Sequence, residues 1–350
     1  MSVAMNESAV RKNGSPEKVV VYRDADADLS YLKGKRVVVL GYGNQGRSQA
    51  LNLCDSGVSV TIASIRDESM ERARADGFAT IPIQGCAKQA DVLMLLIPDE
   101  AQRDVYDAEL ACDMGPGKTL CFGHGYNFHF GYISPPPEVD VVLLAPRMIG
   151  AVVRSAFEAG KGSPAFVSVG QDGSGEAKEV MLALAKGIGA TKAGAIELSF
   201  EQETLIDLFM EQTLMPIFTR SMTWAYEILT EAGIDPGVVT LEMYGSGEMA
   251  EVFQACAKVG FWKQLQFHSR TAQFGELSRK DSVMPSSVRN TMVEALEKIR
   301  SGAFAREWAE DSEAGFPRYN ALIEETRRHP INMAEQEIAR RVDFGASFTE

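Results

Sequence analysis

The sequence predicts two parts, an α/β domain with a doubly wound, mostly parallel sheet and a following all-helical domain. Two observations predict this fold class. Short apolar runs alternate with helix-compatible segments up to about residue 195, and continuous apolar strands separated by helices are typical of a sheet buried on both faces. Beyond that point glycine becomes sparse and long helical patterns take over. A length of 350 residues suits about two domains.

The first domain is expected to span residues 20–196, with the short apolar runs as its strands. A Val-rich run at 37–40 precedes a glycine cluster, a helix-compatible stretch follows at 48–53, and a second apolar run occupies 59–63. This order predicts one βαβ unit. The further predicted strands are 92–97, 120–122, 141–145 and 165–169, with helices at segments such as 71–76 and 176–188.

The second domain is expected at 197–342, with long helices at 200–232, 236–266 and 286–310. Residues 1–19 are largely polar and carry no hydrophobic stretch, which predicts a disordered leader and not a signal peptide. Residues 343–350 have little to pack against and are expected to form a loose tail.

Composition and charge exclude several classes of function. The 48 acidic side chains outnumber the 35 basic ones, for a net charge of −13, and such a surface repels a phosphate backbone, so no nucleic-acid partner is expected. No apolar run approaches the ~18 residues of a membrane helix, so no membrane partner is expected. The five cysteines are scattered without a CxxC pair, which argues against a disulfide framework or zinc ribbon and favours a reducing, cytoplasmic location.

A glycine-rich motif follows the first strand. Gly41, Gly43 and Gly46 form GxGxxG between the run at 37–40 and a helical segment. In that context the glycines permit a tight turn and a close backbone approach to a pyrophosphate, and the helix N-terminus offers unpaired N–H groups. The motif therefore favours a dinucleotide site over a purely structural turn. The loop residues included in the predicted cofactor site are Tyr42, Asn44 and Gln45.

The end of the second strand bears on which nicotinamide cofactor is bound. An acidic residue there would bond the ribose hydroxyls, whereas this strand is followed by Ser64, Arg66 and Ser69. A guanidinium with neighbouring hydroxyls can hold a 2′-phosphate. We therefore expect NADPH in preference to NADH, with Arg66 and Ser69 on the phosphate. The alternative is that Arg66 pairs with a neighbouring carboxylate, Asp67 or Glu68.

Three carboxylates recur at helical spacing early in the second domain. Glu203, Asp207 and Glu211 stand at i, i+4 and i+8, which places them on one face of a helix. Like charges at this spacing destabilise a helix by about 0.2–0.5 kcal/mol per pair. A hard cation such as Mg²⁺, which takes oxygen ligands, would compensate the repulsion. The alternative is an ordinary charged helix face.

A second group of acidic residues lies further along the chain. Glu248 is followed three residues later by Glu251 and preceded six residues earlier by Glu242, with Gly245 and Gly247 interrupting the helical pattern between them. In a chain with 48 carboxylates this spacing by itself does not identify a metal site.

Several sequence runs, taken together, resemble one enzyme family. They are VYRDADADLSYLKGKRVVVLGYGNQG, LLIPDEAQRDVY, GHGYNFHFGYISPP, ETLIDLFMEQ, SRTAQFGE, SGAFAREW, RYNAL and RRHPI. Over about residues 20–342 the chain closely resembles the short form of ketol-acid reductoisomerase. That resemblance implies an NADPH- and Mg²⁺-dependent conversion of 2-acetohydroxy acids to 2,3-dihydroxy acids in branched-chain amino acid biosynthesis. It also implies a Rossmann-type domain, a knotted helical domain that dimerises, and an active site shared by two subunits.

The resemblance assigns roles to individual positions. Asp207 and Glu211 match the family's first pair of metal carboxylates. His124 matches a histidine near the cofactor and metal-bound water, and Asp99 and Gln102 match residues of the nicotinamide pocket. Two residues match the second half of the implied site. Glu248 matches a family carboxylate that binds metal or substrate, and Ser269 matches the serine that binds the substrate carboxylate.

Two positions depart from the family pattern. Arg147 in APRMIGA replaces the lysine of the family's KGPG motif, and a planar guanidinium is not interchangeable with a compact ammonium. Tyr244 stands where the family has its other glutamate, and a phenol of pKa ~10 is a poor Mg²⁺ ligand at neutral pH. The number of metal ions, one or two, therefore stays open, with Glu251 or Glu242 as possible replacements.

Three hypotheses of function follow. The first is a reductoisomerase that performs both alkyl migration and reduction on a small 2-acetohydroxy acid. The second is a reductase of a 2-keto acid or imine that has lost migration, because migration needs polarisation at two points and reduction needs less. The third is a non-catalytic nucleotide-binding protein, since a fold alone does not guarantee chemistry. A homodimer or higher homo-oligomer is expected on the family resemblance.

Overall fold

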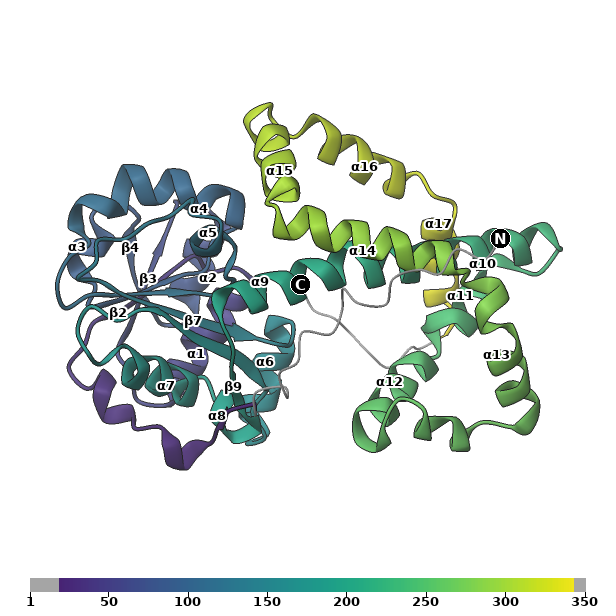
Figure 1. Ribbon diagram of the computed structural model, residues 1–350, viewed down its shortest axis with the longest axis horizontal. Helices are drawn as coiled ribbons and strands as arrows, with labels where there is room; N and C mark the ends of the chain where they lie inside the picture. The colour runs from purple at the N-terminus through teal and green to yellow at the C-terminus, as the bar shows by residue number, and fades with distance from the viewer. Residues whose placement is uncertain (1–18, 343–350) are drawn as a thin grey trace, which may run out of the picture. The chain divides into compact units, whose positions relative to one another are not determined.

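A computed structural model of the chain describes residues 19–342. The predicted tail, and all but the last residue of the predicted leader, lie outside this range. The chain divides into two compact units between Thr204 and Leu205, and Figure 1 shows the sheet of the first and the helices of the second. The prediction of an α/β part followed by an all-helical part is confirmed.

The first unit is built on a nine-stranded sheet of order β1-β9-β8-β7-β6-β5-β2-β3-β4. The strands from β7 to β4 in this order pair in parallel, as do β8 and β9. The β7–β8 and β1–β9 pairs are antiparallel, so the sheet is mostly parallel, as predicted. The strands are β1 Val21–Tyr22, β2 Val37–Leu40, β3 Val60–Ser64, β4 Ala79–Pro82, β5 Val92–Leu95, β6 Thr119–Phe122, β7 Asp140–Pro146, β8 Ala165–Gln171 and β9 Ala195–Glu197.

Helices cover both faces of this sheet (Figure 1). Val37 and Val39 of β2 belong to one buried apolar cluster, whereas Val38 and Leu40 belong to another. Successive strand residues point to opposite faces, so β2 packs against helices on both sides and is buried throughout. The α-helices are α1 Asn44–Asp55, α2 Glu68–Ala75, α3 Cys86–Gln89, α4 Asp99–Val105, α5 Tyr126–His129, α6 Gly150–Glu158, α7 Ala177–Gly187 and α8 Ala190–Ala193, and a π-helical turn, η4, occupies Tyr106–Leu110.

Two glycines of the predicted motif are required by close contacts in the turn from β2 to α1. Gly41 has a φ of +99°, and a Cβ there would lie 2.7 Å from the carbonyl oxygen of Leu96. A Cβ at Gly46 would lie 2.1 Å from the carbonyl oxygen of Gly41. The turn therefore closes only without side chains at these positions, as the dinucleotide-binding motif demands.

Asp91, just before β5, ties that strand to the start of β2. Its carboxylate accepts hydrogen bonds from the Arg36 backbone N–H at 2.8 Å, from Nε at 3.0 Å and from Nη2 at 2.7 Å. These bonds to Arg36, with the attraction of its charge, lower the pKa of Asp91 to about 2.

We expect Asp91→Asn to lower the free energy of unfolding by about 1 kcal/mol at neutral pH. The carboxyl pKa is lower in the folded chain than in the unfolded one, so the ion pair stabilises above an unfolded pKa of ~4, and this stabilisation is lost as the pH falls toward 2. Urea denaturation of both proteins at neutral and acidic pH measures the difference. A difference that does not shrink on acidification would contradict this assignment.

The second unit is helical throughout its described length. It begins within α9 and contains two π-helical turns, η6 and η7, and a 3₁₀ turn, η8. Its elements, with the whole of α9 included, are α9 Phe200–Phe209, η6 Met210–Leu214, α10 Met215–Glu231, α11 Pro236–Thr240, η7 Leu241–Gly245, α12 Glu248–Val259, η8 Lys263–Phe267, α13 Arg270–Val283, α14 Ser286–Arg300, α15 Ala303–Glu313, α16 Pro317–Arg327 and α17 Ile331–Ala339.

The first long predicted helix is a nearly continuous run of α9, η6 and α10. The other two predicted helices are wrong in length, because glycines with left-handed backbone angles interrupt them. These are Gly247 with φ +80°, Gly260 with φ +106° and Gly302 with φ +69°. A glycine in this conformation commonly ends a helix.

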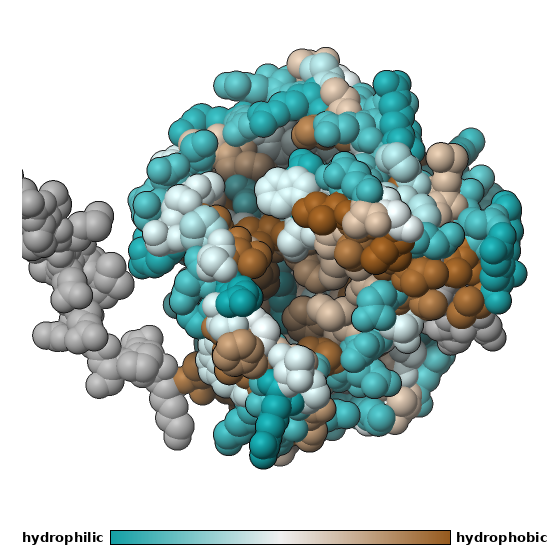
Figure 2. Space-filling view, turned by 90° about the vertical axis from the view of Figure 1, so that its right-hand side faces the viewer, coloured by the Kyte–Doolittle hydropathy of each residue, from teal (hydrophilic) through white to brown (hydrophobic). Residues whose placement is uncertain are grey.

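Large apolar side chains are exposed on the helical unit. Figure 2 shows them gathered around a hollow on the face turned toward the viewer. Six of the large exposed side chains of this unit are Trp224, Ile228, Phe253, Phe261, Trp262 and Phe274, each 56–70% exposed. A compact cluster in this unit buries Tyr226, Val239 and Ala334.

Within residues 19–342 every helix falls short of the length or the apolar character needed to span a bilayer.

Candidate functional site

The candidate site lies at the carboxyl edge of the parallel strands. Asp99 follows β5, His124 follows β6, and Arg147 follows β7. The loops after neighbouring parallel strands meet at one edge of a sheet, which is where doubly wound folds bind ligands. The glycine-rich turn after β2 opens at the same edge, so the topology brings the predicted cofactor loop and these three side chains together.

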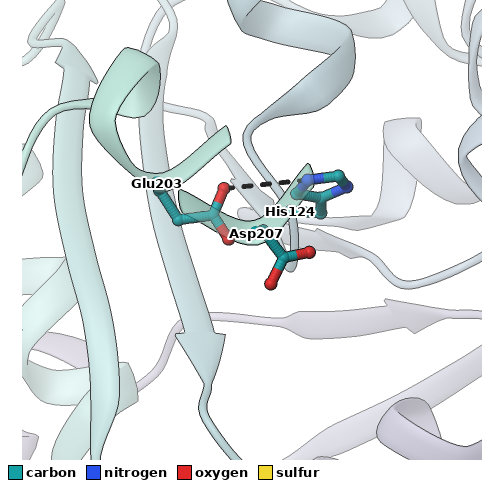
Figure 3. Close-up of side chains that lie close together, drawn as sticks. All are labelled: His124, Glu203 and Asp207. Carbon is teal, nitrogen blue, oxygen red and sulfur yellow. Dashed lines mark ion pairs between the residues drawn. The ribbon is translucent and has the colours of Figure 1, made fainter. Parts of the chain in front are cut away.

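His124, Glu203 and Asp207 form the group best suited to hold a metal ion among the described residues. Each offers one potential ligand atom, and these atoms lie within 4.8 Å of one another. Glu203 and Asp207 stand one turn apart on α9, and Figure 3 shows both carboxylates and the imidazole side by side. The sequence predicted His124 and Asp207 as site residues, and the structure brings them together.

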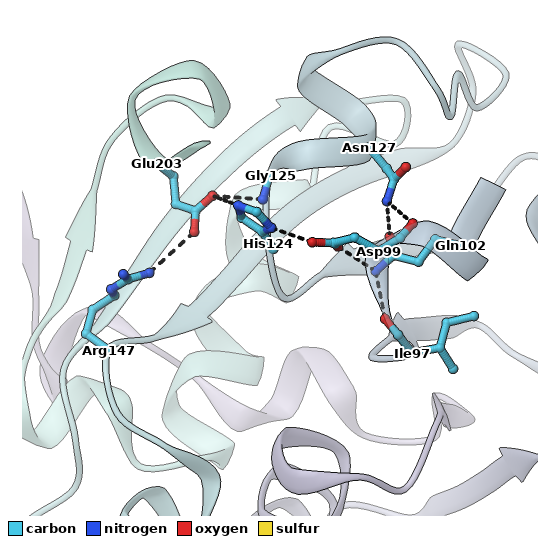
Figure 4. Close-up of polar contacts among 8 residues, drawn as sticks. All are labelled: Ile97, Asp99, Gln102, His124, Gly125, Asn127, Arg147 and Glu203. Atoms are coloured by element: carbon cyan, nitrogen blue, oxygen red, sulfur yellow. Dashed lines mark hydrogen bonds and ion pairs between the residues drawn. The ribbon is translucent and has the colours of Figure 1, made fainter. Parts of the chain in front are cut away.

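Glu203 is the centre of this group and is almost completely buried, at 1% exposure. Its Oε2 accepts a hydrogen bond of 2.8 Å from the backbone N–H of Gly125 and lies 4.0 Å from Nε2 of His124 (Figure 4). Its Oε1 accepts one of 3.4 Å from Nη1 of Arg147. A buried carboxylate is tolerated only when it is paired and hydrogen-bonded, and these contacts meet that condition.

The orientation of His124 is fixed by Asp99. Nδ1 of the ring lies 2.7 Å from Oδ2 of Asp99, and since a carboxylate only accepts, Nδ1 carries the proton. The other ring nitrogen, Nε2, is the one turned toward Glu203 (Figure 4). A carboxylate behind a histidine is the arrangement that sets its tautomer in metal sites.

Gln102 is held within the protein, 3% exposed. Its Nε2 donates to the carbonyl oxygen of Ile97 at 2.9 Å and to Oδ1 of Asp99 at 3.1 Å, and its Oε1 accepts from Nδ2 of Asn127 at 3.0 Å. The side chain therefore orients Asp99, which in turn orients His124 (Figure 4). The family resemblance assigns Gln102 to the nicotinamide pocket, and the structure places its amide in this network.

Arg147 is held from two sides. Its guanidinium lies over the ring of Phe166, 4.8 Å from the ring centroid, and Nη1 donates to Glu203. Stacking on the ring and the forked shape of the guanidinium restrict the conformational freedom of this side chain more than that of a lysine ammonium would be restricted. The departure from lysine therefore places a rigid, permanently charged donor next to the buried carboxylate.

The three carboxylates predicted at helical spacing extend from α9 into the turn that follows it. Glu211 lies in η6, a π-helical turn that follows α9 directly. Glu203 is buried, Asp207 is half-buried and Glu211 is exposed. Such turns are frequent at functional sites, but the sequence pattern does not reveal this one.

The donor set fits a hard divalent cation at one position. Asp207 offers carboxylate oxygens beside an imidazole nitrogen, and Mg²⁺ accepts one or two carboxylates and completes its shell with water. Glu203 is less suited to direct ligation, because its oxygens already serve Gly125 and Arg147. Glu203 is therefore a buried acceptor that lies between Arg147 and the loop of His124.

The predicted cofactor loop differs from expectation at Tyr42. This side chain is 1% exposed, and its hydroxyl donates to Oδ2 of Asp76 at 2.8 Å. Burial, reinforced by that hydrogen bond, raises the pKa of the phenol. Tyr42 therefore packs into the core, and only its backbone belongs to the loop. The sequence could not show that the Tyr42 side chain points into the core, since its partner Asp76 is 34 residues away.

The loop after β3 keeps Arg66 available for a ligand. Asp67 caps α2 by accepting from the backbone N–H of Ser69 and of Met70, and it also accepts from the Ser69 hydroxyl at 2.6 Å. That hydroxyl lies 2.8 Å from the hydroxyl of Ser64. In this part of the described chain Arg66 is exposed and forms no ion pair with Asp67, which disfavours the alternative interpretation of Arg66.

The predicted residues of the second unit lie at helix ends. Glu248 is the exposed first residue of α12, and Ser269 caps α13, its hydroxyl accepting from the backbone N–H of Ala272 at 3.1 Å. Tyr244 lies in η7, and its hydroxyl donates to Oε1 of Glu335 on α17. Burial and this hydrogen bond raise the pKa of Tyr244, so the phenol stays protonated at neutral pH.

Sequence reasoning missed Glu203 as a site residue. Glu203 belongs to the three carboxylates at helical spacing, but nothing local distinguishes it from the exposed Glu201 two residues earlier. The signal lies elsewhere in the chain, at Gly125, where a Cβ would come within 2.9 Å of Oε2 of Glu203. The glycine directly after His124 is the one sequence feature that indicates how closely the Glu203 carboxylate approaches the backbone there.

Two family models match consecutive parts of the chain. The model described as "Acetohydroxy acid isomeroreductase, NADPH-binding domain" matches residues 31–194. The model described as "Ketol-acid reductoisomerase, C-terminal domain" matches residues 200–343. Together they cover most of the sequence.

Curated relatives of similar length carry the same family name. A ketol-acid reductoisomerase (NADP(+)) of Pyrobaculum calidifontis is 42% identical over 93% of this chain and 99% of its own length. That of Pyrobaculum arsenaticum is also 42% identical over the same shares.

One solved structure agrees with the family models, and a more distant one shares only the fold. A NADH-preferring ketol-acid reductoisomerase from an uncultured archaeon is 36% identical, with a TM-score of 0.88 over 93% of this chain and 99% of that one. A semialdehyde dehydrogenase NAD-binding protein from Cupriavidus necator, 17% identical with a TM-score of 0.58 over 76% of this chain and 99% of that one, shares the fold alone.

Proposed function

The chain belongs to the ketol-acid reductoisomerase family of NADP-dependent oxidoreductases, and from this premise we propose that it performs both steps of that family's reaction with NADPH and Mg²⁺. The substrate is a small 2-acetohydroxy acid such as 2-acetolactate. An alkyl group migrates between adjacent carbons, and hydride from NADPH with one proton reduces the resulting ketone. One NADPH is consumed for each 2,3-dihydroxy acid formed.

The observation that carries this proposal is the group of His124, Glu203 and Asp207 at the sheet edge that also bears the glycine-rich loop. The backbone of Gly41, Gly43 and Gly46 is proposed to hold the pyrophosphate. Bound Mg²⁺ would polarise the ketone and hydroxyl oxygens of the substrate.

The remaining predicted residues are proposed to bind and orient the reactants. Asp207 holds the metal, with Glu211 and Glu248 as further carboxylates for it. His124, kept in one tautomer by Asp99, moves a proton at Nε2. Arg147 directs a guanidinium N–H at a substrate oxygen. The hydroxyl of Ser269 is proposed to bind the substrate carboxylate.

Product analysis tests this function. Isotope-labelled 2-acetolactate is incubated with the protein, NADPH and Mg²⁺, and the products are identified by NMR. We expect 2,3-dihydroxyisovalerate in a one-to-one ratio with oxidised NADPH. Absence of this product would refute the reductoisomerase reaction.

A second candidate function is a reductase that has lost migration, and the Tyr244–Glu335 contact favours it. This phenol occupies a position where the family resemblance expects a carboxylate, and its hydroxyl is committed to Glu335. In that case 3-hydroxy-3-methyl-2-oxobutanoate or pyruvate would be reduced while 2-acetolactate stayed unreacted. The third hypothesis, a non-catalytic protein, is disfavoured because the matched relatives are enzymes.

NADPH is the proposed cofactor, with NADH as the weaker one. The exposed Arg66 and the hydroxyls of Ser64 and Ser69 stand together at the end of β3. We expect Arg66→Ala to raise the KM for NADPH about tenfold, since a charge-assisted hydrogen bond contributes roughly 1.5–3 kcal/mol. The KM for NADH should change little. Steady-state kinetics with both cofactors measures this, and equal changes for both would refute contact with a 2′-phosphate.

A homodimer or larger homo-oligomer in the cytoplasm is the proposed state of the protein. The exposed apolar side chains of the helical unit support it (Figure 2), because patches of this kind on soluble proteins usually mark interfaces. Light scattering coupled to size exclusion should give at least twice the 38.2 kDa of one chain. A monomer at micromolar concentration would contradict it.

A further inference from the structure

Gln45 connects the glycine-rich loop to the segment that carries Arg147. Its Nε2 donates a 2.8 Å hydrogen bond to the carbonyl oxygen of Met148. Its Oε1 accepts one of 3.1 Å from Nε2 of Gln49, which is 0% exposed. Because the Met148 carbonyl can only accept, the two contacts fix which end of the Gln45 amide faces it.

The same two segments meet at a second point. A Cβ at Gly150, the first residue of α6, would lie 2.0 Å from the carbonyl oxygen of Asn44. Gly150 has an ordinary helical backbone, so space and not backbone conformation requires a glycine here. The segment from Arg147 to Gly150 therefore packs directly against the dinucleotide loop.

Arg147 is the residue before Met148, whose carbonyl oxygen accepts the hydrogen bond from Gln45. Its guanidinium reaches Glu203 at 3.4 Å, and Glu203 in turn accepts from the N–H of Gly125 beside His124. A continuous path thus runs from the Gln45 side chain through the backbone of Met148 and the side chain of Arg147 to the buried carboxylate. Every residue of this path lies in the first unit.

We propose that Gln45 is a positioning residue for the reaction. When the dinucleotide loop is occupied, the Gln45 side chain fixes the position of Arg147. This inference rests on the proposed function. The Gln45 side chain acts through its bond to Met148, since both ends of its amide are engaged within the protein, while the Gln45 backbone stays part of the predicted cofactor loop. It follows that Gln45 governs turnover and not NADPH affinity.

Gln45→Glu and Gln45→Met test the proposal. Glutamate keeps the shape but places a carboxylate against the Met148 carbonyl, and methionine removes the hydrogen bond without adding charge. We expect kcat to fall about tenfold in both, as for a lost and unreplaced hydrogen bond, with the Kd for NADPH unchanged. A rise in Kd that matches the fall in kcat would instead make Gln45 a cofactor ligand and overturn the proposal.

Hydrogen exchange gives a readout independent of activity. In the wild type, adding NADPH should slow exchange at residues 41–47 and at residues 147–153. In both Gln45 variants the first effect should persist and the second should be lost. Protection of residues 147–153 that persists would overturn the proposal, whereas a wild type without protection at 41–47 would count against the proposed cofactor site itself.

Gln171→Glu is the matched control, because Nε2 of Gln171 also donates to backbone carbonyls, those of Pro136 and Val139. It removes the same kind of bond elsewhere in the unit, so NADPH-dependent protection at 147–153 should be retained. A loss of that protection in Gln171→Glu as well would show a general loosening of the fold and would overturn a specific role for Gln45.

Discussion

Replacing Glu203 with glutamine is expected to lower kcat at least a hundredfold and the free energy of unfolding by about 2 kcal/mol. The carboxylate is 1% exposed and accepts from both Gly125 and Arg147. A neutral amide leaves the guanidinium without its counter-charge and turns an N–H toward one of two donors. The expected loss of stability is smaller than for a fully buried ion pair, because the Arg147 side chain is 29% exposed.

Glu201→Gln provides the control, since Glu201 lies on the same helix and is exposed. It makes the same chemical change two residues away and should leave both kcat and stability near wild-type values. Thermal and urea denaturation with steady-state kinetics separate the two effects. If Glu203→Gln kept full activity, the buried carboxylate would not be what orients Arg147 and His124.

Replacing Asp207 with asparagine is expected to reduce Mg²⁺-dependent turnover about a thousandfold or more, because a metal site that loses an anionic ligand loses both affinity and polarising charge. Asp207 is half-buried and one turn beyond Glu203, so the fold should be maintained. The Kd for NADPH, measured by fluorescence, should not change. Raising the Mg²⁺ concentration should restore part of the activity.

The matched control is Asp104→Asn on α4, which removes an exposed carboxylate of the same type. Its Mg²⁺ dependence should equal that of the wild type. An Asp207→Asn enzyme with an unaltered Mg²⁺ requirement would show that the cation is held elsewhere. Loss of NADPH binding in the same variant would point to a disturbed first unit and not to a missing ligand.

The sheet and the cofactor loop were predictable because their signals are local. Fully apolar runs such as 92–95 mark strands buried on both faces, and the glycines at 41 and 46 are required by steric contacts within or beside the turn. The direction of Tyr42 was not predictable, since it depends on Asp76, 34 residues away. Local patterns thus identify the loop but not which of its side chains face a ligand.

The acidic half of the site was only partly predictable. Helical spacing correctly joined Glu203 and Asp207, but the π turn at 210–214, which carries Glu211, has no counterpart in the sequence pattern. The burial of Glu203 and the Tyr244–Glu335 contact depend on residues 78 and 91 positions away. Long-range packing decides these features, so they required the structure.

Mn²⁺ binding followed by electron paramagnetic resonance tests the central claim most directly. Mn²⁺ prefers the same oxygen ligands as Mg²⁺, and its free-ion signal decreases when it is bound. We predict that the wild type with NADPH binds at least one Mn²⁺ per chain, that Mg²⁺ displaces it, and that Asp207→Asn binds it far more weakly. Equal binding by the wild type and Asp207→Asn, or no binding by either, would contradict a metal centre at Asp207.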